Sequence, residues 1–335
     1  MLSFVTAISI ARRKLVALAA GAAAFGGLTQ SRLARGQAQA QAYRLAVVGG
    51  RTRDSDIFAA FFDELRLYGV VEGQNLTVLP EGFGLRNEQF QGIAAATVNV
   101  APDVIVPSGD LAARIVQDAT RSIPIVALTD DMIAAGLVRS LARPGGNITG
   151  VSLLSTELNG KRLEILMEAV PGAHRIASLS DANSDPMKFQ ALQDGVRSRG
   201  VELANYAVSS PEGIAPAIDA AKSWGATALN VLATPFFSVN RHIVIDSANA
   251  TLLPAIYQWP DMAEDGGLIG YGPRLTTVYR QIARQVVKIL RGAKPADLPV
   301  EQPTTFEFVI NLKTAKAIGH EVPAGLVARA DQVIE

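Results

Sequence analysis

The stretch SLARPGGNITGVSLLS, residues 140–155, marks a sharp change along the chain. Pro144, Gly145 and Gly146 end any helix that precedes them, because proline lacks the backbone N–H donor and glycine readily adopts left-handed turn conformations. A strand-like run, residues 148–152, follows at once. Such a break either closes a surface turn or marks the place where the chain passes from one lobe to another. The pattern on both sides of it decides between the two.

Short apolar runs alternate with amphipathic segments after the first 42 residues. The segment 56–68, DIFAAFFDELRLY, places Phe58, Phe61, Phe62 and Leu65 along one face of a helix. Strands that alternate with helices form a mostly parallel sheet with helices on both faces, so the fold class is α/β. The runs expected to be strands are 44–49, 75–79, 103–106, 123–128, 148–152, 175–179, 201–207, 226–232, 254–257 and 268–271.

The number of these runs favours two domains. The chain has 335 residues, of which 49% are apolar, and this is enough for two domains with a full core each. Four strand–helix units precede Pro144 and at least five follow Gly150. Since domains commonly have about 100 to 150 residues, we interpret the break at 144–146 as the passage between two doubly wound parallel-sheet lobes.

The first 42 residues have the pattern of a secretory signal peptide. They contain no acidic residue, carry Arg12, Arg13 and Lys14, continue without charge from residue 15 to 28, and end in small residues within 38–42. Fourteen uncharged residues are fewer than the roughly 20 of a membrane-spanning helix, so cleavage is expected. The arginine pair resembles a twin-arginine export motif, with Leu15 where phenylalanine is usual, and the export route stays open. The mature protein is expected in the periplasm.

Charge and composition argue against several classes of function. The formal net charge is 0, and removal of the five cations in the first 42 residues leaves about −5, which argues against a nucleic-acid partner. The chain has no cysteine, which excludes disulfides, thiolate zinc sites and a lipid-modified cysteine anchor. His174, His242 and His320 lie too far apart in sequence for a local metal motif. We expect a monomer that is free in solution and holds neither metal nor cofactor.

The sequence lacks the common motifs of covalent catalysis. It contains neither a Gly-x-Ser-x-Gly elbow nor a phosphate-binding loop with Gly-Lys-Ser/Thr. Asp130 and Asp131 could hold a cation or act as acid and base, but neighbouring side chains on an extended chain point in opposite directions. One of them is better suited to capping or to binding a ligand ammonium. We therefore expect a binding protein and not an enzyme.

The loops after the predicted strands form the candidate site, because ligands of parallel α/β sheets bind outside the carboxyl ends of the strands. Residues 108–110 and 183–185 open helices, and the first backbone N–H groups of a helix can bind a carboxylate. The same residue types are ordinary N-caps, so both interpretations stay open. Asp130 or Asp110 is expected to bind an ammonium, and Arg51 and Arg53 are alternative partners of a carboxylate.

Aromatic residues gather at the ends of the later strands. Only 20 of the 335 residues are Phe, Trp or Tyr, yet five of them fall within 36 residues, where an even spread gives about 2. Rings at a cleft mouth stack on flat or apolar ligand groups, although we expect at least two of the five in the core. The five are Phe236, Phe237, Tyr257, Trp259 and Tyr271. The full set of expected ligand-binding residues is Gly50, Arg51, Arg53, Ser108, Gly109, Asp110, Thr129, Asp130, Asp181, Asn183, Ser184, Thr234, Phe236, Tyr257, Trp259 and Tyr271.

Four blocks and the C-terminus resemble one family of transport proteins. The blocks are 136–152 (GLVRSLARPGGNITGVS), 161–177 (KRLEILMEAVPGAHRIA), 266–283 (GGLIGYGPRLTTVYRQIA) and 288–319 (KILRGAKPADLPVEQPTTFEFVINLKTAKAIG), followed by ARADQVIE at 328–335. In this order, they are similar to the ABC transporter substrate-binding proteins of the tryptophan/tyrosine type. The resemblance implies a type I periplasmic binding protein fold, in which two α/β lobes joined by a three-stranded hinge close on a small ligand.

The resemblance also implies a division of the chain into lobes. Beyond the signal peptide, 1–42, it places 43–147 and 273–300 in lobe 1, and 148–272 and 301–335 in lobe 2. The first crossing is expected at 147–151. The chain then returns at 271–273, adds a helix at 276–290 and crosses again at 298–304.

The function that the resemblance implies is that of a periplasmic solute-binding protein. It captures an amino acid or a small aromatic or apolar carboxylate between the lobes and delivers it to the permease subunits of an ABC importer. Two alternatives use the same fold: a periplasmic sensor subunit that signals to a membrane kinase, and an enzyme on the same scaffold. The residues of the expected site match the family's poorly, so the identity of the ligand stays open.

Overall fold

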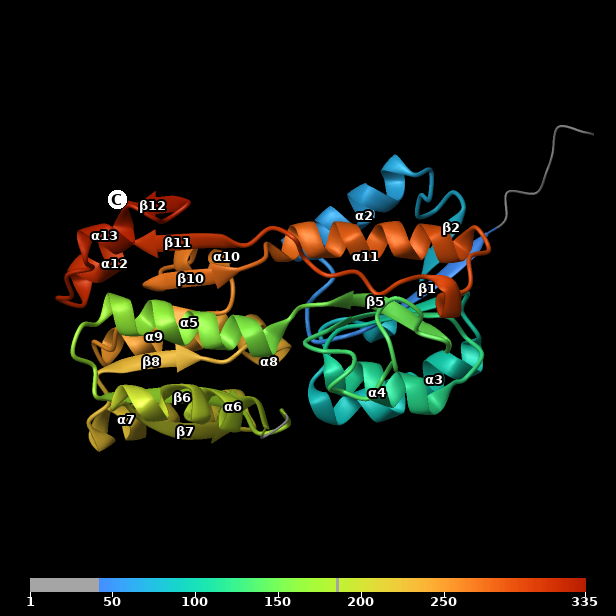
Figure 1. Ribbon diagram of the computed structural model, residues 1–335. Coiled ribbons are helices and arrows are strands. Elements are labelled where there is room, and N and C mark those ends of the chain that lie inside the picture. The colour runs from blue at the N-terminus through green and yellow to red at the C-terminus, as the bar shows by residue number, and fades with distance from the viewer. Residues whose placement is uncertain (1–41, 185–186) are drawn as a thin grey trace, which may run out of the picture. The chain divides into compact units, whose positions relative to one another are not determined.

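The chain from Tyr43 to Glu335 folds into two mostly parallel β-sheets with helices packed on them (Figure 1). The computed structural model describes residues 42–184 and 187–335. The signal peptide expected at 1–42, except for its last residue, and the expected role of Asp185 lie outside the described residues. The α/β fold with two parallel-sheet lobes is confirmed.

The first sheet has five parallel strands in the order β2-β1-β3-β4-β5. Every residue of β3, β4 and β5 is buried, because helices cover both faces of the sheet. We call this sheet and its helices lobe 1. Its strands are β1 (Tyr43–Val48), β2 (Leu76–Val78), β3 (Val104–Pro107), β4 (Ile125–Thr129) and β5 (Ile148–Ser152). Its helices are α2 (Asp56–Leu67), α3 (Phe90–Val100), α4 (Asp110–Ala119) and α11 (Leu275–Leu290), with the 3-10 turns η1 (Pro80–Gly82), η2 (Asn87–Gln89) and η5 (Pro295–Asp297).

The helix α11 joins lobe 1 from a distant part of the sequence. It packs beside α2 on one face of the sheet, while α3 and α4 cover the other (Figure 1). Val278, Ile282, Val286 and Ile289 recur every three or four residues and are buried, which is the pattern of a helix that packs on a sheet along one stripe. The helix predicted at 276–290 is therefore present, and it begins one residue earlier, at Leu275.

The second sheet has seven strands in the order β12-β11-β10-β9-β8-β6-β7, and only the β10–β11 pair is antiparallel. We call this sheet and its helices lobe 2. Its strands are β6 (Arg175–Asp181), β7 (Glu202–Val208), β8 (Ala228–Val231), β9 (Ala255–Tyr257), β10 (Ile269–Gly272), β11 (Glu307–Asn311) and β12 (Gln332–Ile334). Its helices are α5 (Ser155–Ala169), α6 (Met187–Val196), α7 (Ile214–Trp224), α8 (Pro235–Val239), α9 (Arg241–Ala250), α10 (Pro260–Glu264), α12 (Leu312–Ala317) and α13 (Ala324–Val327), with the 3-10 turns η3 (Arg197–Arg199) and η4 (Pro211–Gly213).

All ten predicted strands are present as β1–β10, and two more strands were missed. β11 and β12 lie in the block 301–335, which is expected in lobe 2 but has no predicted strand. β12 has only three residues and pairs with β11 alone, so its local apolar pattern is too short to stand out.

The expected first crossing at 147–151 is wrong in its position. β5 pairs with β4 from Ile148 opposite Ile125 to Ser152 opposite Thr129, so it is a strand of lobe 1. Gly150 permits this pairing, because its φ is +143° and a Cβ there would lie 1.9 Å from the carbonyl oxygen of Ala127. The Pro-Gly-Gly turn therefore leads into the last strand of the first sheet. The crossing follows at residues 153–154, where Leu154 adopts a left-handed conformation with φ 56°.

The later passages between the sheets lie beside this strand. The chain returns at 273–274, between β10 and α11, close to the expected 271–273. After α11, the segment 298–301 runs along β5. Thr149 Oγ1 donates to the carbonyl of Leu298 at 2.9 Å, and the backbone N–H of Ser152 donates to the carbonyl of Glu301 at 2.9 Å. The last crossing thus occurs at 302–306, before β11 begins.

Candidate ligand-binding site

A cavity of about 630 Å³ lies between the carboxyl ends of strands from both lobes. The loops after β1, β2, β3 and β4 line it from lobe 1, and the loops after β6, β7 and β8 line it from lobe 2. We call it the main cavity. Ten of the predicted residues line it: Gly50, Ser108, Gly109, Asp110, Asp130, Asp181, Asn183, Ser184, Thr234 and Phe236.

A second, smaller cavity of about 30 Å³ adjoins the main one. We call it the inner cavity, because buried side chains such as Leu128, Leu275 and Tyr279 form much of its wall. It shares six lining residues with the main cavity: Gly50, Ser108, Gly109, Asp130, Pro235 and Val239. Three more predicted residues, Arg51, Thr129 and Trp259, line the inner cavity.

Three predicted residues line neither cavity. Arg53 forms an ion pair with Glu72, and its guanidinium lies 5.0 Å from the ring centre of Phe62. Tyr257 is fully buried in the core under the sheet, where burial raises the pKa of its phenol. The ring of Tyr271 stacks on Phe306 with 6.4 Å between ring centres.

The reason differs for each of the three. The charge of Arg53 is neutralised at the surface, away from the cavities. Tyr257 points from a central strand into a helix-covered face, and Gly267 leaves room for its ring. Tyr271 packs on the aromatic segment that leads into β11, a strand that was not predicted. With Phe237, which is also fully buried, Tyr257 accounts for the two aromatic residues expected in the core.

Several lining residues were missed because two loops were not considered. The loop after β2 contributes Arg86 and leads to Phe90 at the start of α3, and the loop after β7 contributes Ser210 and Glu212. Both loops follow the carboxyl end of a predicted strand, so the rule that selected the other loops applies to them equally. Arg114, on the second turn of α4, gives no such signal in the sequence.

Side chains at the start of α4 bind helix α11 and the loop after β4. Ser108 Oγ accepts a hydrogen bond from the hydroxyl of Tyr279 at 3.0 Å, and Asp110 Oδ1 accepts one from the backbone N–H of Asp130 at 2.8 Å. Gly109 is the N-cap residue of α4 and has no side chain that could cap the helix. The ordinary capping interpretation of 108–110 therefore does not hold, and the N-terminus of α4 borders the main cavity.

Asp181 and Thr234 form the corresponding wall in lobe 2. Asp181 Oδ1 accepts from the backbone N–H of Asn183 at 2.8 Å, and its Oδ2 accepts from Thr234 Oγ1 at 3.1 Å. The buried side chain of Gln258 binds both backbone groups of Thr234, at 2.6 Å to the N–H and 2.9 Å to the carbonyl. The ends of β6, β8 and β9 are thus held together directly behind the cavity wall.

A buried arginine supports this wall from α5. Arg162 is fully buried and donates to the carbonyls of Tyr271 at 2.7 Å and Gln258 at 3.0 Å, and to Asn159 Oδ1 at 2.9 Å. Burial lowers the pKa of its guanidinium to about 10, and the negative charge of Asp130 opposes that shift. Arg162 therefore links the middle of α5 to the ends of β9 and β10.

The two lobes touch at glycine residues beside the cavities. A Cβ on Gly109 would lie 2.9 Å from Cγ of Pro235, and a Cβ on Gly50 would lie 3.3 Å from Cγ2 of Val239. The guanidinium of Arg51 also crosses to lobe 2 and donates to Ser238 Oγ. The structure is thus one in which the lobes are in contact across the site.

The main cavity carries more carboxylates than cations. Asp131 caps the turn that follows it, since its Oδ1 accepts from the backbone N–H groups of Ile133 at 2.9 Å and Ala134 at 3.0 Å. Hydrogen bonding by Ser210, aided by the charge of Arg86, lowers the pKa of Glu212. The acidic lining residues are Glu88, Asp110, Asp130, Asp131, Asp181 and Glu212, and the basic ones are Arg86 and Arg114.

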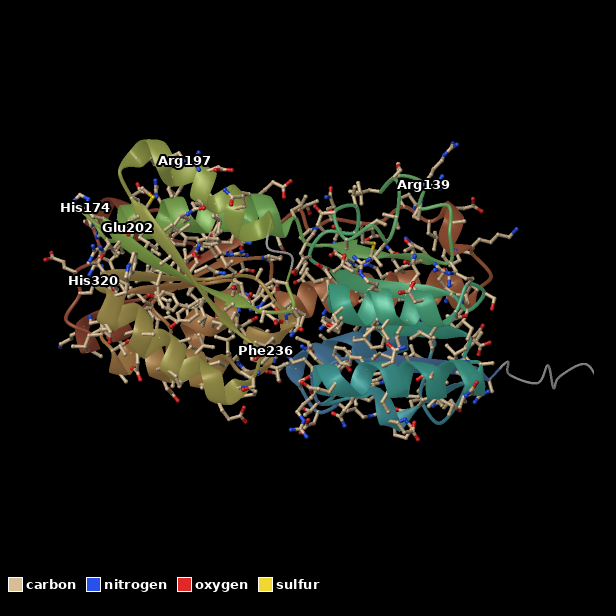
Figure 2. All side chains as sticks on the ribbon, turned by 90° about the horizontal axis from the view of Figure 1, so that it is seen from below. Arg139, His174, Arg197, Glu202, Phe236 and His320 are labelled. Atoms are coloured by element: carbon tan, nitrogen blue, oxygen red, sulfur yellow. The ribbon has the colours of Figure 1, made fainter. Side chains whose placement is uncertain are left out.

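The described residues include no cluster of three or more His, Asp or Glu side chains that could hold a metal ion. His174 and His320 lie at one end of lobe 2, and Phe236 lies at the other (Figure 2). No helix in the described ranges has both the length and the apolar character to cross a membrane.

Comparisons with known proteins agree with this geometry. A family model described as ABC transporter substrate binding protein matches residues 56–334. A tyrosine-binding protein of Clostridioides difficile (strain R20291) is 27% identical over 266 residues, which cover 77% of this chain and 75% of that protein.

Two solved structures are similar over most of the chain. The ABC domain in complex with L-Trp from Streptococcus pneumonia is 25% identical with a TM-score of 0.76, covering 87% of this chain and 100% of that one. A conserved domain protein from Vibrio cholerae O1 biovar El Tor is 23% identical with a TM-score of 0.80, covering 88% of this chain and 100% of that one.

Proposed function

Because the chain belongs to the family of ABC transporter substrate-binding proteins, we propose that it is the solute receptor of an ABC importer. In this role it binds an aromatic or apolar α-amino acid between its lobes and presents the closed form to the permease subunits. It acts in the periplasm as a monomer, after removal of the signal peptide predicted at 1–42. It requires no covalent chemistry.

The main cavity is the observation that carries this proposal. Strand ends of both lobes line it, so a ligand held there contacts both lobes at once. A ligand shifts a conformational equilibrium only through its differential affinity for the two states. Contacts to both lobes exist only in the closed state, and ligand binding therefore favours closure.

The chemistry of the lining supports an amino acid with an apolar body. The six carboxylates favour a ligand that carries an ammonium, and Asp130 is a buried member of that set. Phe90 in lobe 1 and Phe236 in lobe 2 provide aromatic surface for the side chain of the ligand. A volume of about 630 Å³ is within the usual range of small-molecule sites. The tyrosine-binding relative and the L-Trp complex bind ligands of this class.

Calorimetry tests the ligand class. L-tyrosine, L-tryptophan and L-leucine are titrated into the mature protein after it has been unfolded and refolded to remove any bound molecule, with D-glucose as the control. Heat of binding is expected with at least one of the three amino acids and not with glucose. Binding of glucose with no response to any of the amino acids contradicts the proposed class.

Uptake by cells tests the role in transport. Cells of the source organism that lack the protein are expected to lose high-affinity uptake of the amino acid found by calorimetry, and expression of the full chain restores it. Unchanged uptake in the deletion strain, together with normal binding by the purified protein, contradicts the importer role and leaves the binding function in place.

A further inference from the structure

The inner cavity is a small, mostly buried space next to the site of the proposed ligand. It adjoins the main cavity through shared residues, among them Ser108, Gly109 and Asp130. Its volume of about 30 Å³ exceeds the roughly 15 Å³ needed for one water molecule, so the space admits a small polar group. A ligand in the main cavity can thus place one small group there.

Two buried polar side chains on the wall of this cavity have unused hydrogen-bonding groups. Trp259 is 3% exposed and Thr129 is 1% exposed. Neither the indole Nε1–H of Trp259 nor the hydroxyl of Thr129 has a hydrogen-bond partner in the described part of the chain. Buried polar groups almost always have a partner, and the indole N–H can only donate. Both side chains therefore indicate a polar group that occupies the inner cavity when the site is filled.

Arg51 adds a positive charge to the same wall. Its guanidinium donates to Ser238 Oγ, and it forms no salt bridge with any residue that the structure describes. Two lobe 2 carboxylates whose charges act on Arg51 have arginine partners of their own: Asp261 pairs with Arg274 at 3.2 Å, and Asp265 with Arg241 at 2.5 Å. Burial lowers the pKa of Arg51, with Arg241 adding to the effect, which means that its charge is poorly solvated. An anion in the inner cavity would compensate that charge.

We infer that the inner cavity is the subsite for the carboxylate of the ligand, bound by the guanidinium of Arg51, the indole N–H of Trp259 and the hydroxyl of Thr129. This inference rests on the proposed function as an amino-acid receptor. Arg51 and Thr129 belong to lobe 1 and Trp259 to lobe 2, so the carboxylate is held from both sides. Trp259 thus recognises the acid group through its N–H and not by stacking on the body of the ligand.

The position of Asp130 completes the recognition of an α-amino acid. Asp130 lines both cavities and therefore lies at their junction. In an α-amino acid the ammonium is attached to the carbon next to the carboxylate. A carboxylate in the inner cavity places that ammonium at the junction, facing Asp130, and directs the side chain into the main cavity towards Phe236.

A comparison of acids with their decarboxylated amines tests the inference. Wild type, Trp259→Phe and Thr129→Val are titrated with L-tyrosine and tyramine, and with L-tryptophan and tryptamine. Both variants should bind the amino acids about tenfold more weakly and bind the amines as wild type does, because each loses one hydrogen bond to a charged group. Tyr257→Phe is the matched control. It removes a buried, unpartnered aromatic hydroxyl outside both cavities and should change neither affinity.

Each result has a defined meaning. If Trp259→Phe and Thr129→Val weaken acid and amine equally, or weaken neither, the carboxylate does not bind in the inner cavity and the inference is wrong. Thr129→Ser, which keeps the hydroxyl, should retain the affinity of wild type, and loss of affinity in this variant would also contradict the inference. If wild type binds neither amino acid, the proposed ligand class fails and the inference fails with it, a result that the wild-type titrations alone reveal.

Discussion

Lobe 1 and lobe 2 contribute different chemistry to the cavity between them. Lobe 1 contributes six of the eight charged lining residues, four carboxylates and two guanidinium groups. The polar lining of lobe 2 is mainly neutral, with Asn183, Ser184, Ser209, Ser210 and Thr234. We therefore expect lobe 1 to select the charge of the ligand and lobe 2 to provide neutral hydrogen-bonding groups.

The lobes also differ in how their cavity walls are supported. In lobe 1, Ser108 binds Tyr279 of α11, and Asp110 binds the backbone of Asp130 in the loop after β4. In lobe 2, the wall rests on a buried network in which Arg162 and Gln258 bind the backbone at the ends of three strands. A substitution in the lobe 2 network should thus cost stability, whereas a substitution in lobe 1 should cost affinity.

The largest expected effect is on stability, in lobe 2. Arg162→Met removes three hydrogen bonds from a charged donor and leaves the carbonyls of Tyr271 and Gln258 buried without this partner. The free energy of unfolding should fall by about 3 kcal/mol or more. Urea unfolding followed by circular dichroism measures it.

The control for this prediction is an arginine in lobe 1. Arg114 lies on the cavity wall, is exposed, and donates to the carbonyl of Ala135. Arg114→Met should change the free energy of unfolding by about 1 kcal/mol or less. Equal losses in the two variants would mean that the lobes do not differ in their support.

The next effect is on closure, where the lobes touch. Gly109→Ala places a methyl group 2.9 Å from Pro235 and forces alanine to adopt a φ of +97°. Ligand affinity should fall by at least about tenfold, because the closed state is penalised more than the open one. Calorimetry measures the affinity, and small-angle scattering with and without ligand measures closure.

A second glycine separates the contact from the backbone strain. Gly136 also has a positive φ, +67°, but a Cβ there would meet no atom within 4 Å. Gly136→Ala should lower stability by about 1 kcal/mol, as expected for a left-handed residue, and leave affinity unchanged. If both variants lose affinity alike, the strained backbone and not the contact with Pro235 is responsible.

The charge of lobe 1 is tested by Asp130→Asn. The variant should bind L-tyrosine about tenfold more weakly than wild type does. Its affinity for 3-(4-hydroxyphenyl)propionate, which lacks the ammonium, should equal that of wild type. Asp131→Asn is the control, because Asp131 lines the same cavity but caps a turn, and it should not alter this selectivity. A similar loss for both ligands in Asp130→Asn would indicate a structural role for this side chain.

The alternation of strands and helices predicted the fold well, because each strand of a parallel sheet leaves a local apolar run. The position of the first crossing was not predictable in this way. Residues 148–152 form a strand in either lobe by their local pattern, and only the pairing with β4 assigns them to lobe 1. That pairing depends on contacts between residues more than 20 positions apart.

The lining of the cavities was predictable where it follows strand ends and not where it depends on side-chain packing. Ser108, Asp130 and Thr234 line the main cavity as predicted, because the carboxyl ends of the strands meet there. Tyr257 and Trp259 are separated by one residue, yet Tyr257 lies in the core and Trp259 lines the inner cavity. The structural role of Arg162 was not expected, since its partners are backbone carbonyls about 100 residues away.

The smallest expected effect comes from the pair of charges that faces across the mouth of the cavity. Arg86 of lobe 1 lowers the pKa of the exposed Glu212 of lobe 2, although the hydrogen bond from Ser210 has the larger influence. A carboxylate whose pKa is lowered in the closed state favours that state at pH values above its ordinary pKa, and this contribution disappears as the pH falls through the lowered pKa.

Glu212→Gln should therefore weaken ligand binding slightly at pH 7, by less than about threefold, and the difference should shrink at high salt, because exposed charge pairs are screened. Calorimetry at low and high salt measures it. A large effect that is insensitive to salt would instead place Glu212 in direct contact with the ligand, and lobe 2 would then share the charge selection assigned to lobe 1.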